Sequence, residues 1–177
     1  WQFGTDSLRG VRVAVQGLGN VGSNLVKYLD EEGAKIIVSD IDAGKIKTLQ
    51  VSYKLDVMAA DEILFSDCDI LAPCAMGGVV NDESIGKIKA RVIAGGANNQ
   101  LAEPRHGDSL RELGILYTPD YVINAGGLMN VFVELEGYSH ERAWEKTRKV
   151  YDNVWKVFEI AKNDNIGNHT AADRLAE

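Results

Sequence analysis

The chain has 177 residues, of which 45% are hydrophobic and 25% are charged, so we expect one globular domain with a sizeable core. Its formal net charge of −7 argues against binding of nucleic acid or of an anionic membrane surface. No apolar run approaches the ~20 residues that cross a bilayer. We therefore expect a cytoplasmic protein without a signal peptide. Because the first residue is Trp1 rather than Met, we also expect the chain to be part of a longer or processed protein.

Strand and helix patterns alternate along most of the chain. A leading segment at 1–10 comes before a strand at 11–16 and a helix at 20–32, which Gly33 ends. The later predicted elements are, in order, strand 35–40, helix 43–53, short helix 61–63, strand 69–72, a loop with a short helix at 79–88, strand 91–94, helix 103–113, strand 115–117 and helix 128–135. This alternation predicts an α/β fold of the Rossmann type, a doubly wound and mostly parallel sheet with helices on both faces.

A long amphipathic helix at 139–163 follows, and Ser139 is its predicted N-cap. Trp144 and Trp155 lie at the margin of its apolar stripe, so the helix either packs on the core or presents a face to a partner. The stripe itself consists of Ala143, Thr147, Val150, Tyr151, Val154, Phe158 and Ala161.

The strand at 11–16 leads directly into a G-x-G-x-x-G motif made by Gly17, Gly19 and Gly22. The first glycine permits a tight turn, the second lets a pyrophosphate approach the backbone, and the third lets the helix pack on the strand. The unpaired N–H groups at the start of the helix then face the phosphates. Asp40 ends the next strand, where it can accept the ribose hydroxyls of a dinucleotide. The alternative is a glycine-rich turn in a domain that binds no nucleotide.

In doubly wound sheets the ligand lies beyond the carboxyl ends of the strands. The loops predicted at that edge have unusual compositions, rich in Gly, Asn, Asp and Pro. They are 17–22, 40–42, 73–78, 95–100 and 124–127. Their agreement predicts one composite cofactor cleft.

Cysteine and histidine give no sign of a metal site or of a disulfide. Cys68 and Cys74 flank a short predicted strand, which favours reduced thiols. The three histidines show no ligand spacing, so we expect no metal.

Three later motifs occur together and in order: CDILAPCA at 68–75, GANNQL at 96–101 and PDYVINAGG at 119–127. With these motifs the chain resembles the C-terminal, cofactor-binding domain of the glutamate/leucine/phenylalanine/valine dehydrogenases, and it is most similar to the leucine-specific branch. The resemblance covers nearly the whole chain. It implies NAD-dependent oxidative deamination of an apolar L-amino acid to a 2-oxo acid and ammonia.

The resemblance also implies roles for individual residues. The cofactor-binding residues would be Gly17, Gly19, Asn20, Val21, Gly22, Asp40, Ile41, Cys74, Ala75, Ala97 and Asn124. Asn99 would reach the substrate carboxylate, and Leu128 and Val131 would form the wall of the side-chain pocket. Asn98, Asn99 and Asn124 could instead be ordinary turn residues in the left-handed conformation.

The family carries its catalytic lysines and an aspartate on a separate N-terminal domain, and no matching lysine-bearing glycine segment occurs here. We therefore expect no catalytic residue in this chain. Its expected partners are the amino acid substrate and its own N-terminal domain, in a homo-oligomer of the full-length protein. One alternative is a module that senses NAD(H) without catalysis. Another is a glutamate- or phenylalanine-specific member of the family.

Overall fold

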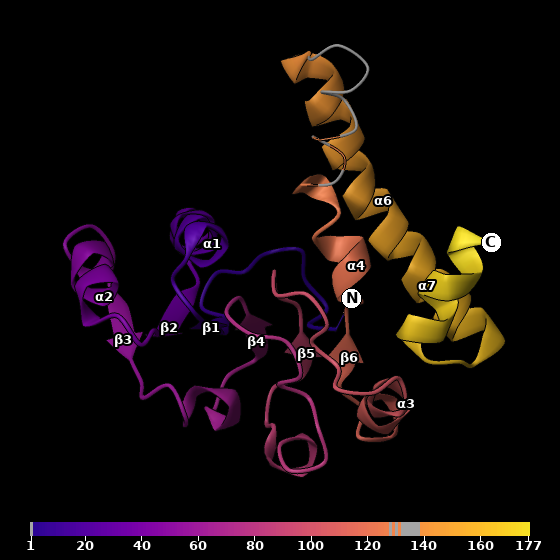
Figure 1. Cartoon of the computed structure of the whole chain (residues 1–177), viewed down its shortest axis with the longest axis horizontal. Coiled ribbons are helices and arrows are strands. Elements are labelled where there is room, and N and C mark those ends of the chain that lie inside the picture. Colours follow the sequence, from indigo (N-terminus) through magenta and orange to yellow (C-terminus); the bar gives the residue numbers. More distant parts are fainter. Residues whose placement is uncertain (1, 128, 130, 132–138) are drawn as a thin grey trace.

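The structure is a computed structural model that describes residues 2–127, 129, 131 and 139–177. Within these ranges it has a six-stranded sheet whose neighbouring strands are all parallel, in the order β3-β2-β1-β4-β5-β6 (Figure 1). The strands are β1 (Arg12–Gln16), β2 (Lys35–Ser39), β3 (Leu55–Val57), β4 (Ile70–Pro73), β5 (Val92–Ile93) and β6 (Leu116–Tyr117). The chain winds from β1 to one edge and restarts at β4 on the other side of β1. The predicted doubly wound fold is confirmed.

Helices cover both faces of the sheet, and each face has its own core (Figure 1). On one face lie α1 (Asn20–Glu31) and α2 (Ala43–Gln50), and on the other lie α3 (Arg105–Glu112) and the short 3-10 helices η1 (Ile63–Phe65) and η2 (Ile85–Lys87). Alternation along β1 supplies both cores, because Val13 and Val15 belong to the first cluster and Ala14 to the second. Their complete burial fixes the position of the turn that follows β1.

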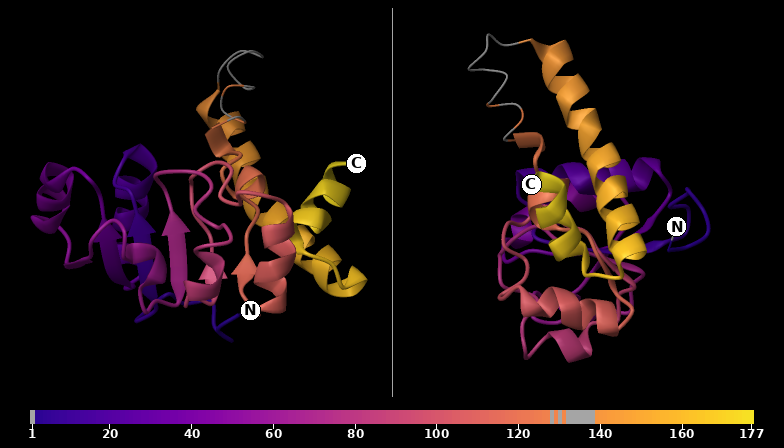
Figure 2. Two further views of the ribbon diagram at one scale, coloured as in Figure 1. Left: turned by 60° about the horizontal axis from the view of Figure 1, so that its bottom comes forward. Right: turned by 90° about the vertical axis from the view of Figure 1, so that its right-hand side faces the viewer.

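The chain closes with α4 (Asp120–Ile123), α6 (His140–Asp164) and α7 (Asn168–Ala176). The side chain of Ser139 accepts a hydrogen bond from the Arg142 backbone, which confirms the predicted N-cap of α6. Beside β6, the C-terminal half of α6 packs against α7, whereas its N-terminal half extends away from the sheet (Figure 2). The predicted stripe is wrong at Tyr151, which is 73% exposed, and it omits Val157, which is fully buried.

Several boundaries differ from the sequence-based expectation. The helix predicted at 43–53 ends at Gln50, because the chain turns there into β3, which was not predicted. This strand has three residues and pairs only with β2, so its sequence shows no extended alternation. The short helices α4 and α7 were also not predicted. The helix predicted at 128–135 falls largely outside the described residues. No helix in the described ranges is long and apolar enough to cross a membrane.

Candidate cofactor site

The turn after β1 has the geometry that the glycine motif predicts. Gly17 has a φ of +90°, and a Cβ on it would lie 2.6 Å from the Cβ of Ala75. A Cβ on Gly22 would lie 1.9 Å from the carbonyl oxygen of Gly17, so the start of α1 can approach the turn only with glycine at that position. By contrast, a Cβ on Gly19 would meet no atom within 4 Å. The backbone at Gly19 therefore borders open space.

The N-terminus of α1 faces that space. The N-cap of the helix is Gly19, which has no side chain to accept from the first N–H groups, and the first turn contains no acidic residue. Asn20 and Val21 in this turn are exposed. Free N–H groups and the positive end of the helix dipole together form a site that attracts an anion such as a pyrophosphate.

Asp40 lies directly after β2 and is tied to the glycine turn. Its Oδ2 accepts a hydrogen bond of 2.6 Å from the backbone of Leu18, and its Oδ1 accepts one of 2.8 Å from the backbone of Asp42. Burial alone would raise the pKa of this carboxyl, but the two backbone donors and the nearby Lys45 outweigh it and hold the pKa below its usual range. A carboxylate fixed in this way keeps free lone pairs that can accept hydroxyl groups.

A cavity of about 480 Å³ joins these elements at the carboxyl ends of β1, β2 and β4. Its lining comprises Gln16, Gly17, Gly19, Ser39, Asp40, Ile41, Lys45, Ala60, Cys74, Ala75 and Met76. Six of the predicted cofactor residues thus share one cavity. Cys68 and Cys74 are free thiols, as expected, and burial raises the pKa of Cys74, which makes it a neutral part of the wall.

Sequence reasoning missed three polar residues of this cavity, namely Gln16, Ser39 and Lys45. Gln16 and Ser39 are register partners on β1 and β2, and their side-chain oxygens are buried without a hydrogen-bond partner within the described residues. Their alternation with apolar strand residues resembles ordinary strand patterning, so no local signal marks them. Buried polar atoms without a partner are rare, and a polar ligand in the cavity would satisfy them.

The loop after β5 forms the second half of the predicted cleft. The side-chain amide of Asn124 donates to the carbonyl oxygen of Gly96 at 3.2 Å and to Asn98 at 2.8 Å. Ala97 is buried and donates to the carbonyl oxygen of Pro73 at the end of β4. Gly96 packs against Val21, since a Cβ on it would lie 2.4 Å from that side chain. The structure therefore brings Ala97, Asn124 and Val21 together beside the glycine turn.

A buried network that the sequence reasoning also missed holds this loop in place. The Gln100 side chain is fully buried and donates to the carbonyl oxygens of Gly95 and Ala97. Its backbone N–H donates to Asp120 at 2.6 Å, and Asp120 also accepts a hydrogen bond from the Tyr117 hydroxyl. Burial and the charge of Asp120 raise the pKa of Tyr117, which keeps this donor protonated.

The predicted substrate residues are less closely grouped. Asn99 has a φ of +53°, as its reading as a turn residue requires, whereas Asn98 and Asn124 do not have positive φ. Asn99 lines a separate cavity of about 340 Å³ with Tyr121 and His169 among its other residues. Val131 is 51% exposed, and Leu128 lies outside the described residues. Val131 is not among the residues that line the cavity containing Asn99.

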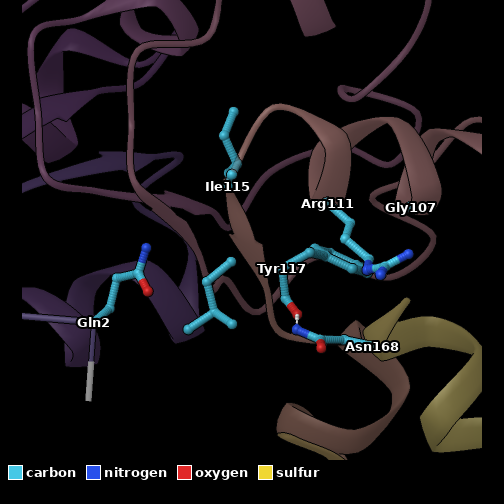
Figure 3. Close-up of a pocket in the computed structure, with 8 residues that line it drawn as sticks. Gln2, Gly107, Arg111, Ile115, Tyr117 and Asn168 are labelled. Atoms are coloured by element: carbon cyan, nitrogen blue, oxygen red, sulfur yellow. Dashed lines mark hydrogen bonds between the residues drawn. The ribbon is translucent and has the colours of Figure 1, made fainter. Parts of the chain in front are cut away.

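A further cavity of about 200 Å³ lies beside β6, away from the glycine turn (Figure 3). Gln2, Arg111 and Asn168 contribute side chains to it, and the Asn168 amide donates to the carbonyl oxygen of Tyr117. None of the predicted cofactor residues lines this cavity. The candidate site is therefore the one at the sheet edge beside α1.

Comparison with known proteins identifies the family of this chain. A family model for glutamate/leucine/phenylalanine/valine dehydrogenase matches residues 2–47 and 38–164, which together span most of the sequence. The chain belongs to this family. The resemblance of its later motifs to the dehydrogenases is thereby confirmed.

Individual relatives differ in the amino acid that their names give. Leucine dehydrogenase from Geobacillus stearothermophilus is 54% identical over 99% of the chain, and phenylalanine dehydrogenase from Thermoactinomyces intermedius is 46% identical over 98%. The crystal structure of L-tryptophan dehydrogenase from Nostoc punctiforme covers 98% of the chain and 52% of that protein, with 45% identity and a TM-score of 0.95. The chain spans about half the length of the curated relatives, 48% in both enzymes named first.

Proposed function

We propose that this chain is the NAD-binding domain of an amino acid dehydrogenase that interconverts an apolar L-amino acid with its 2-oxo acid and ammonia. One observation carries the proposal. The ionised carboxylate of Asp40, the open backbone at Gly19 and the uncapped N-terminus of α1 border one region at the carboxyl edge of the sheet. A diol and a pyrophosphate are the groups that these features attract.

The residues present fit NAD. Gly17, Gly19 and the first N–H groups of α1 would hold the pyrophosphate, and Asp40 would accept the adenosine ribose hydroxyls. Ile41, Cys74 and Ala75 would form the apolar wall beside the adenosine. When bound, the nicotinamide accepts a hydride from the substrate or returns it.

The second half of the site would orient the reacting end of the cofactor. Asn124 and the loop through Ala97 are linked by hydrogen bonds and lie next to α1, so they can fix the position of the ring. Asn99 would hold the substrate carboxylate, and Leu128 and Val131 would contact its side chain. The lysine that activates water would come from the other domain, and closure of the two domains would exclude bulk solvent.

An apolar substrate follows from the proposed wall. A charged side chain beside Leu128 and Val131 would lose water without gaining a partner, whereas an aliphatic one gains about 0.8 kcal/mol per buried CH₂. The greater identity to leucine dehydrogenase favours a branched aliphatic substrate. The likeness to the phenylalanine and tryptophan enzymes supports an aromatic amino acid as the second candidate.

The test is a comparison of amino acids with the complete protein that contains this chain. We expect kcat/KM for leucine, valine or isoleucine to exceed that for glutamate by at least ~100-fold, the ratio that ~2.7 kcal/mol provides. Phenylalanine in first place would select the second candidate. Glutamate in first place would overturn the assignment of the pocket, while the cofactor site would be tested separately by NADH binding.

A further inference from the structure

Lys45 is the only basic residue among those that line the 480 Å³ cavity in the described structure. It stands in the first turn of α2, five positions after Asp40. Its Nζ lies 3.8 Å from Oδ2 of Asp40, and its side chain is 47% exposed whereas that of Asp40 is only 7% exposed. A partly exposed cation thus lies beside a buried, hydrogen-bonded anion in the region proposed for the adenosine ribose.

We propose that cofactor choice in this protein depends on the pair Asp40–Lys45, with Lys45 as a specificity-determining residue that partly restores affinity for a ribose 2′-phosphate. The inference rests on the proposed function, because it assumes that the ribose lies against Asp40. It adds to that function a residue that makes the NAD preference smaller than Asp40 alone would impose.

A 2′-phosphate beside Asp40 is repelled by the carboxylate, and the repulsion is strong because Asp40 is buried and both of its oxygens are held by backbone donors. The ammonium of Lys45 lies within 4 Å of that carboxylate, so it exerts an opposing attraction on the same phosphate. The other two residues of the loop 40–42 offer the phosphate no cation, because Ile41 is 97% exposed and uncharged and Asp42 is exposed and acidic.

Lys45 has little to offer a ribose without the phosphate. Two hydroxyl groups need acceptors, which Asp40 supplies, whereas a lysine has donors only. Removal of the Lys45 charge should therefore affect the two cofactor types differently. Lys47 provides a matched control, since it lies on the same helix, is exposed and does not line the cavity.

The experiment measures binding of ADP-ribose and of 2′-phospho-ADP-ribose to the 177-residue chain by calorimetry. Both probes lack the nicotinamide, so they report on the adenosine end alone. For Lys45→Gln we expect about fivefold weaker binding of the 2′-phosphorylated probe and a change of less than about twofold for ADP-ribose. Lys45→Arg should keep the original ratio, and Lys47→Gln should change neither affinity by more than about twofold. The effect of Lys45→Gln should shrink as salt is added.

The outcomes distinguish a failure of the inference alone from a failure of the proposed function on which it rests. Equal responses of Lys45→Gln and Lys47→Gln would overturn the inference, because they would show only the general loss of a positive charge. An equal loss for both probes in Lys45→Gln would also overturn it. If the unmodified chain binds neither probe, the proposed function fails and the inference fails with it.

Discussion

The carboxylate of Asp40 accepts a hydrogen bond of 2.6 Å from the backbone N–H of Leu18, and this bond ties the end of β2 to the glycine turn after β1. The same turn is held a second time, because the N–H of Gly17 donates to the carbonyl oxygen of Ser39 at 2.8 Å. Two hydrogen bonds between the ends of neighbouring strands therefore join the proposed pyrophosphate and ribose subsites. A substitution in one subsite should alter binding in the other.

Asp40→Ala should weaken NADH binding by about 10- to 100-fold, the range expected when ~1.5–3 kcal/mol of hydrogen bonds to a charged group is lost. The difference in affinity between NADH and NADPH should become smaller, because the charge that repels a 2′-phosphate is gone. Calorimetric titration of both cofactors measures this. Asp42→Ala is the comparison, since it removes the N-cap of α2 but no residue that lines the cavity, so it should cost about 1 kcal/mol of stability and change the ratio of NADH to NADPH affinity less than Asp40→Ala does. An unchanged ratio of affinities in Asp40→Ala would contradict the role given to this residue.

Gly19→Ala should separate binding from stability. The new Cβ meets no protein atom within 4 Å, and Gly19 has a φ of −71° that alanine adopts readily, so the free energy of unfolding should change by less than ~1 kcal/mol. The same Cβ projects into the space through which a pyrophosphate would reach the backbone, so NADH affinity should fall at least about tenfold, or ~1.4 kcal/mol. Gly86→Ala is the comparison, because it also adds a methyl group in open space but lies away from the cavity. Unchanged NADH affinity in Gly19→Ala would contradict the assignment of the pyrophosphate to this turn.

Asp82 should contribute stability that depends on pH. Hydrogen bonds from Arg105 and then His106 lower the pKa of Asp82 from its ordinary value of 3.8 to about 2. A carboxyl with a lowered pKa in the folded state stabilises the fold above the unfolded value, and that contribution is lost as the pH falls from 3.8 to about 2. Urea unfolding should therefore find Asp82→Asn less stable than the parent at pH 6, with a difference that shrinks below pH 4. A difference in stability that grows as the pH falls would contradict a lowered pKa of Asp82 in the folded state.

The sequence predicted the parts of the fold with long, regular patterns. β1, β2 and α1 have clear periodicity and glycine boundaries, and all three form within one residue of the expected ranges. The strand β3 was not predicted, because an edge strand of three residues is too short to show alternation of apolar and polar residues. Tyr151 was misplaced since helical spacing indicates which residues share a face, but not where along the helix a neighbour exists to cover that face.

The candidate site was predictable where the backbone geometry allows only one residue type. Gly17 and Gly22 are such positions, because a Cβ on either would clash with neighbouring atoms. Lys45 and Gln100 could not be found in this way, because their importance lies in contacts across the fold with Asp40 and Asp120. Long-range contacts of this kind leave no local pattern in a single sequence.

We propose that this chain holds NAD and that the catalytic groups come from the other domain of the full-length protein. Calorimetric titration of the 177-residue chain with NADH and NADPH tests it most directly, with an assay for NADH production from leucine and NAD on the same sample. We predict that NADH binds more tightly than NADPH, since two anions ~4 Å apart repel by about 1–4 kcal/mol at effective dielectric constants of 80 to 20. We also predict no turnover. Tighter binding of NADPH, no binding of NADH, or NADH production that depends on the pure chain would contradict the account.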